Sequence, residues 1–210
     1  MTRLTESPNF QYAGSWHPSG KFLVFTAFGD TTGADLMMLP MEGDAVRGWA
    51  PGKPAVFLRT PADEMAPMFS PDGRWIAYQS NEAGGGTSDV YVRPFPGPGG
   101  RWRVSTEGGV YPHWSTAVNE LLFASLNEGR VMFTPYAVAG ESFLADKPQV
   151  WSPTGIRLAG FLTGSPYDLH PDGKRLAAAA GRDQGDVSQD KVVLVFNFLD
   201  YLRKIAPPAK

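Results

Sequence analysis

The feature that most constrains the fold of this chain is a hairpin-like stretch that occurs four times. In chain order, the copies are SWHPSGKFLVFTA (15–27), MFSPDGRWIAYQS (68–80), HWSTAVNELLFAS (113–125) and DLHPDGKRLAAAA (168–180). One turn position is held by Gly20, Gly73, Val118 and Gly173, so it recurs after 53, 45 and 55 residues. Periods of this size are typical of stacked supersecondary units.

Each copy contains the residues that a tight turn between two strands requires. A large apolar residue ends the first strand in every copy: Trp16, Phe69, Trp114 and Leu169. In the second copy Ser70 opens the turn, Pro71 presets φ, Asp72 bonds nearby backbone and Gly73 takes the left-handed position. The stretches RWIAYQ and KFLVFT then alternate in the manner of half-buried strands. The repeat therefore predicts an antiparallel hairpin.

Further strands follow each hairpin. The predicted third strands are ADLMMLP (34–40), SDVYVRPF (88–95), GRVMFTPYAV (129–138) and KVVLVFN (191–197). The predicted fourth strands are AVFLRT (55–60), RWRVST (101–106) and PQVW (148–151). Such four-stranded antiparallel meanders are the blades of β-propellers. We therefore predict an all-β chain that forms a single propeller domain over residues 1–210. Its blades are predicted at about 15–60, 66–106, 111–151 and 166–197.

The repeats resemble those of the TolB-like propellers, a WD-repeat-like class. The residues that carry the resemblance are FSPDGRWIAYQSNEAGGGTSDVYVRPFPGPGGRWRVSTEGG (69–109). The chain looks most similar to the C-terminal propellers of bacterial serine/threonine kinases, especially those of acidobacteria. The resemblance implies six or more blades, whereas this chain supplies four. It is therefore either a small closed propeller or part of a larger one with six blades.

The two ends of the chain suggest a way to close the ring. Residues 2–6 look like the fourth strand of a preceding blade, and the last copy ends after its third strand, before a helix predicted at 197–205. One strand and three strands complete one blade, so we predict that residues 2–6 pair with strand 191–197. Closure would remove the unpaired edges that favour association. An open propeller could instead self-associate.

Composition excludes several classes of protein. The net charge is −2 with no Lys/Arg cluster, so no nucleic-acid partner is predicted. The longest aliphatic runs fall far short of the roughly 20 residues of a membrane span, so no membrane insertion is predicted. The chain has no Cys, which excludes disulfides and thiolate metal sites. The expected compartment is the cytoplasm if Met1 is the true start, or outside it if the parent is a membrane-anchored kinase.

The sequence also lacks the motifs of enzymes that carry propellers. The Gly-rich phosphate loop, the HRD-type catalytic loop and the DFG-type metal site of kinases do not occur. The G-x-S-x-G elbow of serine hydrolases is matched only in half, by GTSDV (86–90) and GESFL (140–144). We therefore predict that this chain is not an enzyme and has no catalytic residue, metal or cofactor.

The chain has three histidines, two of which are candidate metal or anion ligands. His17 and His170 occupy the turn position that Ser70 and Ser115 hold in the other copies. In a ring, equivalent positions could converge on an ion. The alternative is that each imidazole replaces the serine hydroxyl and bonds its own turn, and this interpretation is favoured because no third ligand is evident. For His113, beside Trp114, packing is the favoured role.

Three residues remain as surface candidates for binding a ligand. Asp63 and Glu64 form the only adjacent acidic pair that precedes an inner strand, so they could face a substrate or cation, or simply carry solvated loop charge. Trp49 lies in a predicted loop, AVRGWAPGKP, outside the strand periodicity, which favours a surface contact.

These observations predict a non-catalytic propeller that binds a protein or peptide. By resemblance, it would be the sensory or interaction part of a bacterial kinase-type signalling protein. The alternative is a propeller that binds a small ligand or glycan, or hydrolyses one, with its site at the central channel. The first interpretation favours an aromatic face, whereas the second favours a polar pocket or converging carboxylates.

Overall fold

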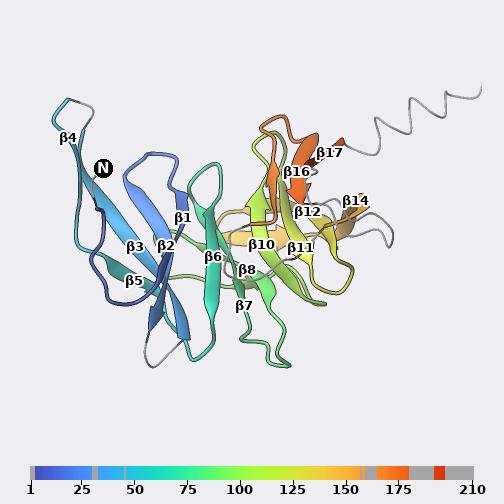
Figure 1. Cartoon of the computed structure of the whole chain (residues 1–210), viewed down its shortest axis with the longest axis horizontal. Coiled ribbons are helices and arrows are strands. Elements are labelled where there is room, and N and C mark those ends of the chain that lie inside the picture. Colours follow the sequence, from blue (N-terminus) through green and yellow to red (C-terminus); the bar gives the residue numbers. More distant parts are fainter. Residues whose placement is uncertain are drawn as a thin grey trace, which may run out of the picture.

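The computed structural model describes residues 3–29, 33–44, 46–156, 158, 165–179 and 192–196. The ordered elements in these ranges are β-strands in four antiparallel sheets, which follow one another in chain order (Figure 1). We call these sheets blades I to IV. No helix in the described ranges is long and apolar enough to cross a membrane. The helix predicted at 197–205 lies outside the described residues.

The strands of each blade follow the predicted order. Blade I contains β1 (Gln11–Trp16), β2 (Phe22–Gly29), β3 (Gly33–Asp44), β4 (Gly48–Pro51) and β5 (Ala55–Leu58). Blade II contains β6 (Glu64–Phe69), β7 (Trp75–Ser80), β8 (Asp89–Pro94) and β9 (Trp102–Arg103). Blade III contains β10 (Gly109–Trp114), β11 (Glu120–Ser125), β12 (Arg130–Ala139), β13 (Ser142–Ala145) and β14 (Gln149–Gly155). Blade IV contains β15 (Tyr167–Leu169), β16 (Arg175–Ala179) and β17 (Val192–Phe196). The predicted all-β fold of antiparallel blades is confirmed, while the number of strands per sheet among the described residues is five, four, five and three.

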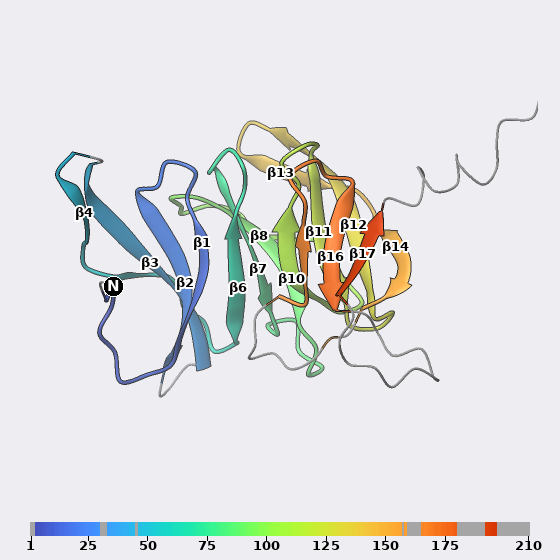
Figure 2. The same ribbon diagram turned by 45° about the horizontal axis from the view of Figure 1, so that its top comes forward.

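The blades are held together by apolar side chains that alternate along their strands. On β2, Val24 packs against Phe69 and Ile76 of blade II, while its neighbours Leu23 and Phe25 point to the opposite face. Alternation of this kind gives every middle strand two apolar faces, one for each adjacent blade. The core is therefore a series of apolar layers, each between two sheets. Figure 2 shows the sheets side by side.

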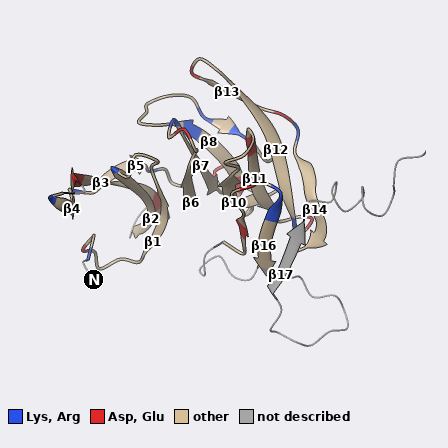
Figure 3. Ribbon diagram, turned by 90° about the horizontal axis from the view of Figure 1, so that it is seen from above, with Lys and Arg blue, Asp and Glu red and all other residues tan. Residues whose placement is uncertain are grey.

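Two hairpins were not predicted. In blades I and III the third strand runs on past the point where the fourth strand pairs, and turns back as β4 or β13. Gly43 and Gly140 have positive φ in these hairpins, so the backbone can bend sharply there. Seen from above, β4 and β13 lie at the outside of the molecule (Figure 3).

Ring closure was predicted but is not formed in this structure. The described part of the predicted closing strand, residues 3–6, belongs to no strand, and β17 pairs with β16 in a sheet of order β15-β16-β17. The N-terminal residues lie beside blade I, at the opposite end of the series of blades from β17 (Figures 1 and 2). This separation prevents the two segments from pairing within one copy, and Leu4 packs against the apolar layer of Leu23, Phe25 and Leu39.

Candidate functional site

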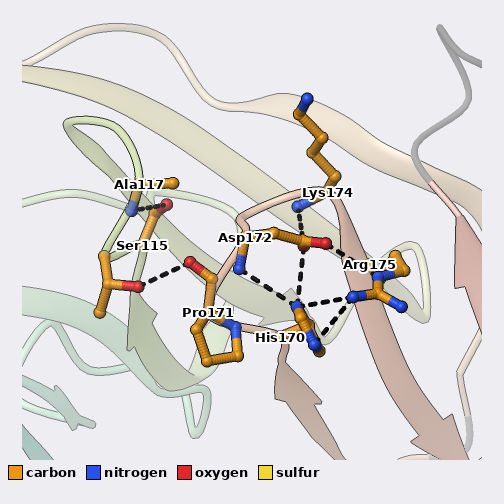
Figure 4. Close-up of polar contacts among 8 residues, drawn as sticks. Ser115, Ala117, His170, Pro171, Asp172, Lys174 and Arg175 are labelled. Atoms are coloured by element: carbon orange, nitrogen blue, oxygen red, sulfur yellow. Dashed lines mark hydrogen bonds and ion pairs between the residues drawn. The ribbon is translucent and has the colours of Figure 1, made fainter.

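The two turn histidines bond to their own turns. Nδ1 of His17 accepts the backbone N–H of Ser19 at 3.1 Å, and Nδ1 of His170 accepts that of Asp172 at 3.2 Å (Figure 4). Oγ of Ser115 accepts the backbone N–H of Ala117, also two residues further on, at 3.3 Å in blade III. The imidazoles therefore replace the serine hydroxyl in the turn. Within the described ranges, no group of three or more His, Cys, Asp or Glu residues could hold a metal ion.

Asp63 ties blades I and II together. Its Oδ1 accepts the backbone N–H of Ala34 in β3 at 3.0 Å, and its Oδ2 accepts Nδ2 of Asn81 at 3.0 Å. The backbone N–H of Asp63 donates to Oδ1 of Asn81 at 2.9 Å. Oδ1 thus joins blade II to blade I, whereas Oδ2 bonds within blade II, so both carboxylate oxygens are engaged in holding the fold.

Glu64 is fully buried, so the interpretation of this residue as a solvated loop charge is wrong. It is the first residue of β6, and Oε1 accepts a hydrogen bond from the Thr60 hydroxyl while Oε2 is buried without a hydrogen-bond partner. Burial raises the pKa of Glu64, and the carboxylates of Asp35 and Glu82 raise it further, against the lowering effect of Thr60. This environment favours the protonated acid.

Trp49 lies in a strand, not in the predicted loop. It belongs to β4, where it pairs with Gly43, and 47% of its surface is exposed. The loop was predicted because a short hairpin strand with exposed residues shows no alternation of polar and apolar residues. Trp49 and the pair Asp63–Glu64 are separate features, and none of the three lines the pocket described next.

The first strands of blades I to III share an irregularity. Their pairing with the second strand shifts register between Ala13 and Ser15, between Met65 and Met68, and between Val110 and His113. A register shift of this kind marks a β-bulge, which re-aims side chains and is common beside functional sites.

The bulges are held in uncommon backbone conformations. Ala66 has φ 52° and Tyr111 has φ 54°, in the left-handed region that non-glycine residues seldom adopt, and each precedes a proline. In blade I the corresponding stretch contains Gly14. A Cβ at this glycine would lie 2.5 Å from the carbonyl oxygen of Pro67, so β1 and β6 approach closely here. Backbone strain of this kind is concentrated at functional sites in proteins.

The three bulges surround a cavity of about 340 Å³, which we call the inner-strand pocket. Much of its lining is apolar, from Ala13, Met65, Ala66, Pro67, Met68 and Pro112. Figure 3 shows the contributing strands β1, β6 and β10 in succession, on the side of the sheets away from β4 and β13. Since three blades contribute, the pocket exists only in the assembled propeller.

A few polar groups lie among the apolar ones. Oε1 of the buried Gln79 accepts the backbone N–H of Tyr111 at 2.9 Å, which fixes the bulge of β10. The hydroxyl of Thr26 is buried at the pocket without a hydrogen-bond partner. Oγ of Ser15 accepts the backbone N–H of Phe69 at 2.7 Å, so this serine links blades I and II.

His113 joins the pocket to blade IV. Its Nε2 lies 3.1 Å from Oδ1 of Asp168, and its ring packs near Tyr167 with centroids 5.7 Å apart. Burial lowers the pKa of His113, and the Asp168 carboxylate opposes that shift. The neutral ring is therefore favoured near neutral pH, where it can offer one donor and one acceptor. Packing was the predicted role, and the structure adds the Asp168 carboxylate as a polar partner of the ring.

The pocket can hold an apolar group and offer it a small number of hydrogen bonds. This combination is typical of binding sites. The pocket was not predicted from the sequence, although one signal was present: Ala66-Pro67 and Tyr111-Pro112 interrupt strands at equivalent places. Proline inside a strand indicates a bulge or an edge.

Comparisons with known proteins bear on the fold. No protein-family model matches the chain, and a search of curated proteins finds no match. Among solved structures, TolB from Acinetobacter baumannii aligns with a TM-score of 0.61 and 17% identity, over 93% of this chain and 43% of that one.

Two further structures are candidate 6-phosphogluconolactonases. The protein from Bacteroides uniformis aligns with a TM-score of 0.55 and 19% identity, over 88% of this chain and 55% of that one. The protein from Bacteroides fragilis aligns with a TM-score of 0.53 and 15% identity, over 89% of this chain and 54% of that one. The chain thus spans about half the length of the structures that it matches. It has the TolB-like β-propeller fold.

Proposed function

We propose that this chain is a non-catalytic binding module that receives an apolar segment of a protein partner in the inner-strand pocket. The observation that carries the proposal is the pocket itself, built by three bulged first strands and lined mainly by apolar side chains. Its volume of about 340 Å³ suits a few side chains of an extended peptide.

The chemistry of the lining favours a peptide. Met65 and Met68 are flexible and polarisable, and methionines of this kind adapt to varied apolar partners. The unpartnered hydroxyl of Thr26 can bond a backbone amide or carbonyl group, and Nδ1 of the neutral His113 ring can accept a backbone N–H while Nε2 faces Asp168.

The arrangement of the polar groups supports binding without catalysis. Within the described ranges, the serines of the pocket are engaged with backbone: Ser15 Oγ accepts the Phe69 N–H, and Ser165 Oγ donates to the carbonyl of Tyr167 at 2.6 Å. The buried carboxylate of Glu64 lies outside the lining and serves a junction between blades.

We also propose that the parent protein is a bacterial kinase-type signalling protein in which this propeller senses or binds a partner. The support is the resemblance of residues 69–109 to the propellers of such kinases. Sequencing the complete transcript tests this proposal. A kinase domain in the same reading frame would support it, and a complete frame without one would refute it.

Selection of peptides tests the binding proposal. A displayed library of random peptides is selected on the wild-type chain, and the enriched peptides are measured by calorimetry on two variants. Met65→Glu places a charge in the pocket. Leu144→Glu makes a matched change at an exposed leucine of β13, outside the pocket. We expect the enriched peptides to be apolar. Their affinity for the Met65→Glu variant should be at least tenfold lower than for wild type, and their affinity for the Leu144→Glu variant should be unchanged.

The opposite results would refute the proposal. These are the absence of any enriched peptide, or peptides that bind Met65→Glu as tightly as wild type. A thermal-shift screen with sugars and divalent metals tests the alternative of a small-ligand or hydrolase site, because a ligand of the folded state raises the unfolding midpoint.

A further inference from the structure

Among the described residues, no sheet packs on the face of blade I that points away from blade II (Figure 1). Leu23, Phe25 and Leu39 form the apolar layer of this face, against which Leu4 packs. Between the N-terminal segment and β1 lies an open cavity of about 570 Å³, and Phe10 in its lining is 58% exposed. In blades II and III the corresponding face is covered by the preceding blade. We call this surface of blade I the open face.

The N-terminal segment occupies the place of an outer strand from a missing blade. Phe57, in β5, and Trp102, in β9, each lie seven residues before the inner strand of the next blade. Phe57 packs on the layers of blade II, and Trp102 packs on Phe143 of blade III at a centroid distance of 6.5 Å. Leu4 likewise lies seven residues before Gln11 and packs on blade I.

Blade IV, in the described ranges, has an outer edge that no further strand pairs with. In the described part of the chain its sheet is β15-β16-β17, with no fourth strand on β17. A sheet edge of this kind presents unpaired N–H and C=O groups that favour pairing with another chain. In the described ranges blade IV lacks an outer strand. Residues 3–5, at the other end of the series of blades, resemble such a strand.

The repeat gives the register that such pairing would have. The turn glycines Gly73 and Gly173 place β7 and β16 100 residues apart. In blade II, Val92 pairs with Trp102 and Tyr91 pairs with Arg103. Since Ala77 pairs with Val92 and Ala177 with Leu194, Leu194 takes the place of Val92.

The same register places Val193 where Tyr91 lies. The outer strand would then set Leu4 opposite Leu194 and Thr5 opposite Val193. These two pairs follow from the strand register alone and can be tested directly.

We propose that residues 3–5 of one copy of the chain complete blade IV of a second copy, so that two copies form one eight-bladed ring. Within one copy the two partners lie at opposite ends of the series of blades (Figures 1 and 2). A ring of eight blades lies within the range of known propellers. A symmetric pair closes both junctions at once, which leaves no free edge.

Mass measurement is the first test. Light scattering on a size-exclusion column should give twice the chain mass of 22.8 kDa for the wild type. Leu4→Asp should abolish the dimer, whereas Leu144→Asp, a matched change at an exposed leucine, should retain it. A monomeric wild type at micromolar and higher concentrations overturns the proposal, and so does a dimer that Leu4→Asp leaves intact.

Cross-linking tests the register without relying on the fold of a destabilised variant. The chain has no Cys, so engineered thiols have no background. An equimolar mixture of Thr5→Cys and Val193→Cys, mildly oxidised, should give a disulfide-linked dimer. A mixture of Val118→Cys and Val193→Cys should not, although Val118 is 51% exposed.

The double variant Thr5→Cys/Val193→Cys separates closure between copies from closure within one. On oxidation it should give a covalent dimer with two disulfides. A cross-linked monomer would mean that a single chain closes on itself, and covalent ladders of three or more copies would mean open assembly. Either result refutes the two-copy ring.

Discussion

The close approach of β1 and β6 at Gly14 makes this glycine the most informative position for substitution. We expect Gly14→Ala to destabilise the propeller strongly although it adds a single methyl group. The added Cβ would lie 2.5 Å from the Pro67 carbonyl oxygen, 2.7 Å from the Val24 carbonyl oxygen and 2.8 Å from Pro67 Cγ. Two of these atoms belong to backbone, so neither can rotate away as the end of a side chain could.

The size of the stability loss follows from how far the added Cβ would overlap neighbouring atoms. The first contact is shorter by about 1 Å than an ordinary contact of this type, so β1 and β6 must separate or shift. Overpacking of this kind costs about 1–3 kcal/mol, and the lower chain entropy of alanine in the unfolded state returns about 0.4–1 kcal/mol. A net loss of about 1.3 kcal/mol in the free energy of unfolding is expected.

Urea unfolding followed by tryptophan fluorescence measures this loss. With a slope of about 2 kcal/mol per molar urea, the midpoint should fall by about 0.7 M. Gly155→Ala is the matched control, because its nearest neighbour, the Gly129 carbonyl oxygen, would lie at 3.5 Å, an ordinary contact. Gly14→Ala and Gly155→Ala with equal midpoints would refute the reasoning and the close approach on which it rests.

Three further substitutions probe the junctions between and within blades. Asp89→Asn removes the charge of the buried carboxylate that accepts a hydrogen bond from Arg103. The free energy of unfolding, measured in urea, should fall by about 2 kcal/mol, and a fall of less than about 0.5 kcal/mol would contradict a stabilising role of this pair. Trp114→Phe removes the bond from Nε1 to the carbonyl of Met68 and should cost about 1–2 kcal/mol by the same assay, while an unchanged midpoint would argue against that bond. Burial lowers the pKa of His113, so the folded state binds this proton less tightly than the unfolded state and loses stability as the pH falls below 6.5. The melting temperature of His113→Gln should therefore fall less over that range than that of wild type, and parallel curves would exclude the effect.

The fold was predictable because most copies of the repeat contain the residues that mark the turn between two strands. Gly20, Gly73 and Gly173 all have positive φ in the structure, as the turn requires, and each is followed by an alternating strand. The turn role of His17 and His170 was also evident from their alignment with serine. Local chemistry determines such features, since every interaction involved spans only a few residues.

The candidate site was not predictable in the same way. Glu64 follows Asp63 in a loop-like sequence, and nothing local shows that a neighbouring sheet buries one carboxylate and bonds the other. Trp49 lies in a stretch with the composition of a loop, but it pairs with Gly43 in a hairpin that extends β3. Both outcomes depend on packing partners that are distant in sequence.

By itself, the sequence determined the strand class, the turns, the period of the repeat and the order of strands within each blade, because these follow from periodicity and from the φ preferences of Gly and Pro. Only the tertiary structure decided that the bulges at Ala66 and Tyr111 meet beside Gly14 to form one pocket, and that residues 3–6 lie on blade I rather than on β17. The reason is that contacts between blades join residues about 50 positions apart, and a pattern read along one strand contains no information on which face of another sheet it will meet.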